Sequence, residues 1–167
     1  MIFRLTNKLA KKIKSTPGRS CPVDPNPYAD WTAHLFTADR VKYILISNTA
    51  SLYSVVMYGK GITDDCIFLD IATSYLADFL REDDNEFIFR KFVAPSMGRS
   101  TFATSLNRSV TGSMNELAFM AKVYLTDTEI SPFDVSFKLN ECFMSYIGSE
   151  RPRKAFMTMA LNKMRAE

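Results

Sequence analysis

Three strand-like runs between residues 31 and 57 constrain the fold of this chain more than any other feature. Residues 31–36 place alternate side chains on two faces before a turn at 38–40. Residues 43–46 and 52–57 are rich in β-branched and aromatic side chains, with a turn or bulge at 48–50 between them. Successive strands joined by turns predict an antiparallel meander, with Trp31 buried on its inner face.

Amphipathic helices are predicted to cover this sheet. Apolar residues with helical spacing run through 67–80, again through 114–125, and finally through 155–164, where Pro152 suits the first turn. A chain of 167 residues has the usual size of one domain. The sequence therefore predicts a single α+β domain over residues 1–167, with a mostly antiparallel sheet and its helices packed largely on one face.

Further elements are expected before and after the meander. Residues 1–5 suit a short strand, and Thr6 is the expected N-cap of a helix through Lys14. The proline-rich residues 15–30 predict a long loop, and residues 86–93 predict another strand. Residues 132–140 fit either a strand or a helix, because their apolar side chains match both periods.

Composition narrows the class of protein. Hydrophobic residues make up 47% and charged residues 23% of the chain, which is typical of a folded globular protein rather than a disordered one. No run of about 18 apolar residues is present to span a membrane, and the first residues lack the pattern of a signal peptide. We therefore expect a cytosolic protein, either monomeric or a small homo-oligomer.

Positive charge gathers near the N-terminus. Residues 1–60 contain nine Lys or Arg and three Asp, whereas residues 61–90 contain two basic and eight acidic residues. A basic surface built on Lys8, Lys11, Lys12 and Lys14 would meet nucleic acid or another acidic partner. Because no recognised nucleic-acid-binding motif accompanies these lysines, a solvated helix face is the competing interpretation.

Sequence signatures of catalysis and metal binding are missing. The chain contains no G-x-S-x-G, G-x-x-x-x-G-K-[ST], H-E-x-x-H or G-x-G-x-x-G motif, and no spacing gives its single histidine, His34, a nucleophile. Cys21, Cys66 and Cys142 form no C-x-x-C pair, so no metal or cofactor is expected, and burial is expected for the last two thiols. The carboxylates at 64–65 are expected at a helix N-terminus, and those at 82–84 in a solvated turn.

The candidate ligand site is the polar segment 107–115, which runs into the helix at 114–125. Asn107 or Ser109 can cap that helix, and Arg108 adds a positive charge beside its unpaired N–H groups, an arrangement that binds anions in other proteins. Gly112 is expected to allow a close approach by another backbone or a ligand. The alternative is a capped structural helix. The candidate ligand-binding residues are Asn107, Arg108, Ser109, Asn115, Asn48 and His34.

Three sequence motifs carry a family resemblance. They are Trp31-x-Ala33-x-Leu35-Phe36, the run from Arg40 to Tyr53, and Asn107-Arg108-Ser109-Val110-x-Gly112-Ser113-Met114-Asn115. The chain resembles, over most of its length, an uncharacterised bacterial family known as a domain of unknown function. The resemblance implies no reaction, substrate or catalytic residue. Taken together, the sequence favours a non-catalytic interaction or binding domain with a protein partner. The alternative is a small enzyme or a protein that binds a small anionic ligand, using a pocket near Arg108, Asn115 and His34.

Overall fold

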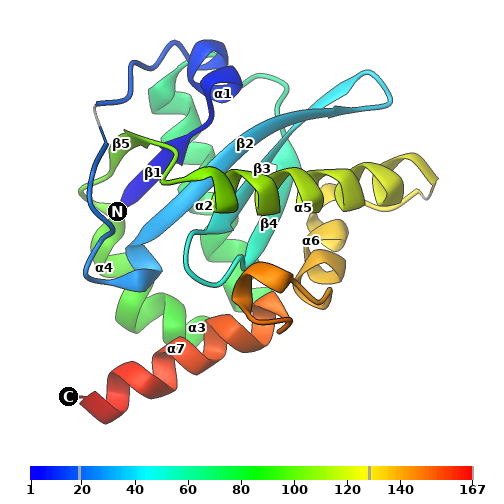
Figure 1. Cartoon of the computed structure of the whole chain (residues 1–167). Helices are drawn as coiled ribbons and strands as arrows, with labels where there is room; N and C mark the ends of the chain where they lie inside the picture. The colour runs from blue at the N-terminus through cyan, green and yellow to red at the C-terminus, as the bar shows by residue number, and fades with distance from the viewer. Residues whose placement is uncertain (19, 128, 167) are drawn as a thin grey trace.

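The computed structural model describes residues 1–18, 20–127 and 129–166, and its α+β fold is built around a five-stranded sheet (Figure 1). The strands are β1 (Ile2–Leu5), β2 (Asp30–Ala38), β3 (Val41–Asn48), β4 (Ser54–Tyr58) and β5 (Thr101–Thr104). They lie in the order β4-β3-β2-β1-β5.

Helices connect and follow these strands. The α-helices are α1 (Asn7–Lys12), α2 (Asp65–Glu82), α3 (Glu86–Ile88), α4 (Ala94–Met97), α5 (Arg108–Asp127), α6 (Pro132–Asn140) and α7 (Pro152–Ala166). A π-helical turn (Phe89–Val93) joins α3 to α4, and short 3₁₀ turns occur at Pro27–Ala29 and Ser145–Ile147.

The sheet is mixed rather than mostly antiparallel. The predicted meander is confirmed for β2, β3 and β4, which pair antiparallel. However, β1 pairs in parallel with both β2 and β5. Parallel neighbours need a long crossover connection, and residues 6–29 supply one between β1 and β2.

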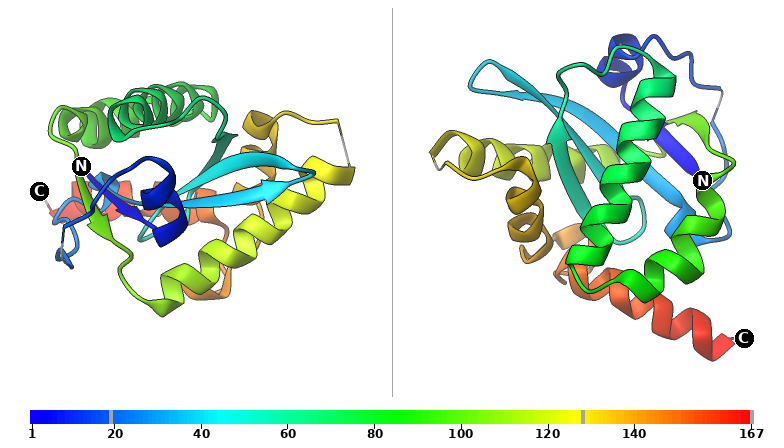
Figure 2. Two further views of the ribbon diagram at one scale, coloured as in Figure 1. Left: turned by 90° about the horizontal axis from the view of Figure 1, so that it is seen from above. Right: turned by 180° about the vertical axis from the view of Figure 1, so that it is seen from behind.

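The helices cover both faces of the sheet, so the expected one-sided arrangement is wrong (Figure 2). Ile44 and Ile46 of β3 join the core that includes α2 and α7. Tyr43 and Leu45 join a second core beneath α5 and α6. Because the run 43–46 is apolar at every position, β3 can bury both of its faces, as strands inside layered sheets do.

Residues 86–93 are helical, and the strand predicted there is wrong. They form α3 and the π-helical turn, with four apolar side chains buried at helical spacing. These side chains are Ile88, Phe89, Phe92 and Val93. Phe87 and Phe89 would share one face of a strand, but Phe87 is 56% exposed whereas Phe89 is buried. Burial of one helical side therefore outweighs the local alternation.

Helix ends decide one alternative that the sequence left open and correct one predicted boundary. Residues 132–140 form α6, because Ser131 accepts a hydrogen bond from the Asp134 N–H and Pro132 occupies the first turn. α1 ends at Lys12 rather than Lys14. Thr6 is its N-cap residue, as expected, but its side chain makes no capping hydrogen bond.

The edge strand β4 is covered by side chains of α6. Asn140 accepts a hydrogen bond from the Ser54 N–H at 2.7 Å and donates one to the Ser54 carbonyl at 2.9 Å. Ser136 accepts a hydrogen bond from the Val56 N–H at 2.8 Å. An unpaired strand edge is a template for association with another chain. α6 therefore satisfies these backbone groups and blocks that template.

The thiols do not follow the expected burial. Cys66 is exposed and Cys142 is half-buried, and both are unpaired, as is Cys21. Cys66 lies two positions before the buried Phe68 of α2, which places it on another side of that helix. Among the helices of the described residues, none is long and apolar enough to cross a membrane.

Candidate anion-binding pocket

A pocket of about 430 Å³ opens between α1, β2 and α5. Figure 1 shows α5 crossing one face of the sheet, and α1 following the upper end of β1, which pairs with the middle of β2. We call this cavity the His34 pocket. It is lined by Lys8, His34, Leu35, Phe36, Thr37, Asn115, Ala118, Phe119 and Lys122.

Local geometry positions the polar wall of the His34 pocket. Residues four and seven positions apart lie on the same side of an α-helix, so α5 presents Asn115, Phe119 and Lys122 together. Lys8 comes from the first turn of α1. His34 lies in the middle of β2, two positions before Phe36 and therefore on the same face of the strand, and both line the pocket.

The His34 pocket is electropositive. Lys8, His34 and Lys122 line it, no carboxylate does, and neither lysine forms an ion pair with a described residue. Burial, followed by the two neighbouring lysines, lowers the pKa of His34 below its ordinary value. The buried Nδ1 of His34 has no hydrogen-bond partner in the described structure. No described protein group therefore fixes the tautomer of the ring.

Two of the six candidate ligand residues, His34 and Asn115, meet in this pocket. Asn107 instead caps α5, because its Oδ1 accepts a hydrogen bond from a backbone N–H of the first turn at 3.0 Å. Arg108 and Ser109 are exposed in that same turn, roughly 10 Å along the helix axis from Asn115. The start of the segment is therefore a capped helix, and the pocket lies two turns further along.

Sequence reasoning missed Phe119 and Lys122. They lie four and seven positions after Asn115, on the same side of the predicted helix. A helical-wheel projection of the sequence would therefore have placed them beside Asn115. Lys8 was selected for a different purpose, as part of a basic surface. Its three companions in that surface do not line the pocket: Lys11, Lys12 and Lys14.

Gly112 lies at an open position of α5, where an added Cβ would meet no described atom within 4 Å beyond the nearby backbone of the helix itself. The expected close approach is therefore wrong. Gly112→Ala is expected to raise the free energy of unfolding by up to about 1 kcal/mol, because alanine loses less backbone entropy in a helix. Urea denaturation followed by circular dichroism measures this gain.

Gly59→Ala is the contrasting variant for Gly112→Ala. Its Cβ would lie 3.1 Å from the Lys42 carbonyl oxygen, so we expect a loss of stability there. A free energy of unfolding that stays unchanged or falls in Gly112→Ala contradicts the assignment of this position as open.

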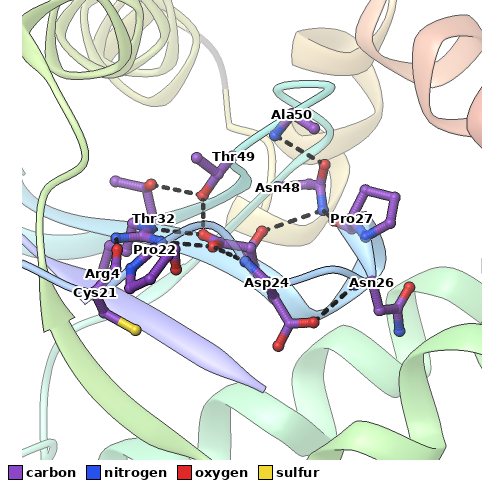
Figure 3. A network of polar contacts seen from close by, with 11 residues as sticks. Arg4, Cys21, Pro22, Asp24, Asn26, Pro27, Thr32, Asn48, Thr49 and Ala50 are labelled. Carbon is purple, nitrogen blue, oxygen red and sulfur yellow. Dashed lines mark hydrogen bonds and ion pairs between the residues drawn. The ribbon is translucent and has the colours of Figure 1, made fainter.

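Asn48 belongs to a different polar cluster, which lies at the N-terminal end of β2 (Figure 3). At its centre Arg4 and Asp30 form a buried ion pair, in which Nε and Nη2 of Arg4 each donate to one carboxylate oxygen at 2.8 Å. The Arg4 guanidinium also donates to the backbone carbonyls of Cys21 and Pro22, each at 3.0 Å.

Protein groups surround the Asp30 carboxylate completely. Thr49 donates its hydroxyl to Oδ1 at 2.7 Å, and the Asp24 N–H donates to Oδ2 at 3.2 Å. Asn48 donates to the Pro27 carbonyl at 2.8 Å and accepts from backbone N–H groups of the next turn. The cluster therefore ties the loop at 21–30 and the turn at 48–51 to β1, and Asn48 has a structural role within it.

One carboxylate of the segment 82–84 is buried, so the expectation of a solvated turn is wrong for Asp83. It is 6% exposed and accepts hydrogen bonds from the Tyr53 hydroxyl at 2.6 Å and the Asn85 amide at 3.0 Å. Arg153 of α7 places Nε 3.1 Å from this carboxylate without hydrogen-bond geometry. Burial raises the pKa of Asp83, opposed by Tyr53 and Arg153. These contacts fasten α7 to the end of α2.

Comparison with known proteins gives the family. Residues 2–155 match the family described as a domain of unknown function, DUF6933. The chain belongs to this family. The resemblance to an uncharacterised domain family is thereby confirmed. The DUF6933 match contains β1 to α6 in full and ends within the first turn of α7. Neither the curated proteins nor the solved structures contain a significant match to this DUF6933 chain.

Proposed function

We propose that this domain binds a small anion, such as a carboxylate or a phosphate monoester, in the His34 pocket. The observation that carries the proposal is a half-buried histidine beside two lysines. Among the described residues, one ring nitrogen of this histidine has no partner, the lysines form no ion pair, and no carboxylate lines the pocket. A bound anion would accept hydrogen bonds from the lysines and from a protonated His34.

Electrostatic repulsion among the side chains of the pocket supports this proposal. Lys8 and Lys122 both disfavour the charged form of His34. An anion between them would remove that repulsion and favour protonation instead. Asn115 and Thr37 add neutral hydrogen-bonding groups, which suit the oxygen atoms of a carboxylate or phosphate.

The residues that line the His34 pocket favour binding without catalysis. Nucleophilic catalysis needs a nucleophile within hydrogen-bond reach of a base that is itself oriented by a third group. Thr37 supplies the one hydroxyl among the described residues that line the pocket, and it makes no hydrogen bond to His34; a cysteine, a serine and a carboxylate are all missing from that lining. The unpartnered Nδ1 of His34 also lacks the third group.

We also propose a cytoplasmic location. The three cysteines are unpaired in the structure. Reduced thiols are the usual state in the cytosol, whereas oxidising compartments favour disulfides.

Nuclear magnetic resonance of the imidazole protons tests the anion site, because His34 is the single histidine of the chain. The pKa of His34 is measured in the free protein and with sulfate or inorganic phosphate. We expect the anion to raise it. Binding should therefore tighten as pH falls through the interval between the pKa of the complex and that of the free protein.

Charge-neutralising variants identify the residues responsible. Lys8→Gln and Lys122→Gln are each expected to raise the pKa of His34 in the free protein, because a repelling charge is gone, and to weaken its response to the anion. Lys11→Gln is the matched control, since Lys11 lies on α1 outside the pocket. The proposal fails if neither anion moves the pKa of His34, or if Lys11→Gln weakens the response as much as the pocket variants.

A further inference from the structure

A second cavity lies between the turn of the β2-β3 hairpin and the C-terminal end of α5. Its volume is about 610 Å³. We call it the tyrosine pocket. It is lined by Asp39, Tyr43, Tyr58, Leu125, Thr126, Asp127, Glu129, Ile130 and Ser131.

The tyrosine pocket is electronegative, in contrast to the His34 pocket. Asp39, Asp127 and Glu129 line it, and none of them forms an ion pair with a residue that the structure describes. The described part of its lining contains no lysine, arginine or histidine. The last turn of the 20-residue helix α5 also borders it, and the C-terminal end of a helix attracts cations.

Two tyrosines provide an aromatic wall. Their ring centroids lie 5.4 Å apart, and Tyr58 is 56% exposed. Tyr43 is only 7% exposed, yet its hydroxyl has no hydrogen-bond partner among the described residues. The Tyr43 oxygen itself is accessible to solvent, since it is not one of the buried side-chain atoms that lack a partner, and a ligand in the cavity can therefore reach it. The faces of aromatic rings attract organic cations.

The spacing of the carboxylates favours an organic cation over a metal ion as the ligand. The oxygens of Asp39, Asp127 and Glu129 do not all lie within 4.8 Å of one another, whereas the ligands of one metal ion must converge. A cavity of this volume has room for a small organic molecule, and the separated carboxylates suit one with several separated positive charges.

We propose that the tyrosine pocket binds a linear polyamine. Its separated ammonium groups pair with the separated carboxylates, and its methylene chain packs on the ring of Tyr58. The unpartnered Tyr43 hydroxyl accepts a hydrogen bond from one ammonium group. This site is distinct from the His34 pocket and takes a ligand of opposite charge.

Isothermal titration calorimetry with spermidine on the full chain tests this proposal. We expect saturable binding that persists when Mg²⁺ is added at matched ionic strength. Glu129→Gln and Asp39→Asn are each expected to weaken binding about two- to fivefold, as for a partly exposed ion pair. Tyr58→Leu is expected to weaken it by a similar factor, about two- to fivefold, because the aromatic face is removed.

Asp70→Asn is the matched control, because it removes the same charge from the exposed face of α2. Circular dichroism and thermal melts establish that each variant is folded. The proposal is overturned if spermidine does not bind, if Mg²⁺ at matched ionic strength abolishes binding, or if Asp70→Asn weakens binding as much as the pocket variants. Loss of anion binding at His34 does not affect this result.

Discussion

Arg4→Met is expected to lower the free energy of unfolding by about 3–5 kcal/mol, because it leaves the buried Asp30 carboxylate without its countercharge. Methionine keeps much of the apolar volume of arginine, so the loss reports the charge and its hydrogen bonds. The backbone carbonyls of Cys21 and Pro22 would also lose their donors. Urea denaturation followed by circular dichroism measures the change.

Arg90→Met provides the matched exposed control. Arg90 forms an ion pair with Glu86 at 2.6 Å, but the two side chains are 75% and 50% exposed. Solvent screens such a pair, so this variant is expected to change stability by no more than about 1 kcal/mol. Equal losses in Arg4→Met and Arg90→Met would contradict the structural role of the buried pair. If Arg4→Met does not fold at all, Asp24→Ala, which keeps the pair and removes a neighbouring side chain of the loop, should still fold.

Trp31→Ala is expected to cost about 3–5 kcal/mol, because a large apolar side chain is removed from a packed core. Trp31 is fully buried, donates its indole N–H to the Tyr28 carbonyl at 2.9 Å, and lies 6.1 Å from the ring of Phe156 in α7. A loss of this size is a large share of the stability of a typical domain. The change is measured by urea denaturation.

Two variants and one spectrum check the Trp31 prediction. Trp31→Phe keeps an aromatic ring and should lose less stability than Trp31→Ala. Phe119→Ala removes a side chain that is 68% exposed and should stay within about 0.5 kcal/mol of the parent. Because Trp31 is the single tryptophan, native fluorescence characteristic of a water-exposed indole would contradict its burial.

The elements with strong local signals could be predicted from the sequence. Alternation in β2 and short connections to β3 and β4 specify a meander, because cross-strand neighbours there are also near in sequence. The helical period of residues 67–80 likewise predicts α2, where Asp64 caps the first turn. Burial of Trp31 also follows from its place in the alternation.

Pairings between strands that are far apart in the sequence could not be predicted from such local signals. β1 could be recognised as a strand, but its position between β2 and β5 depends on contacts with residues about 30 and 100 positions away. The strand predicted at 86–93 is replaced by helix because packing of a buried side outweighs local preference.

The candidate site residues were also determined partly by the sequence and partly by the tertiary structure. The sequence by itself placed His34 on a strand and Asn115 on a helix, because hydrophobic periodicity is a property of neighbouring residues. Only the tertiary structure joins them with Lys8 and Lys122, and it leaves Arg108 and Asn48 elsewhere. That outcome depends on how α5 crosses the sheet. The buried residues of α5 pack with those of β2 and β3 in a shared core, and this packing decides where the helix lies. Such packing maximises burial over segments that are far apart in the chain, and no local pattern encodes it.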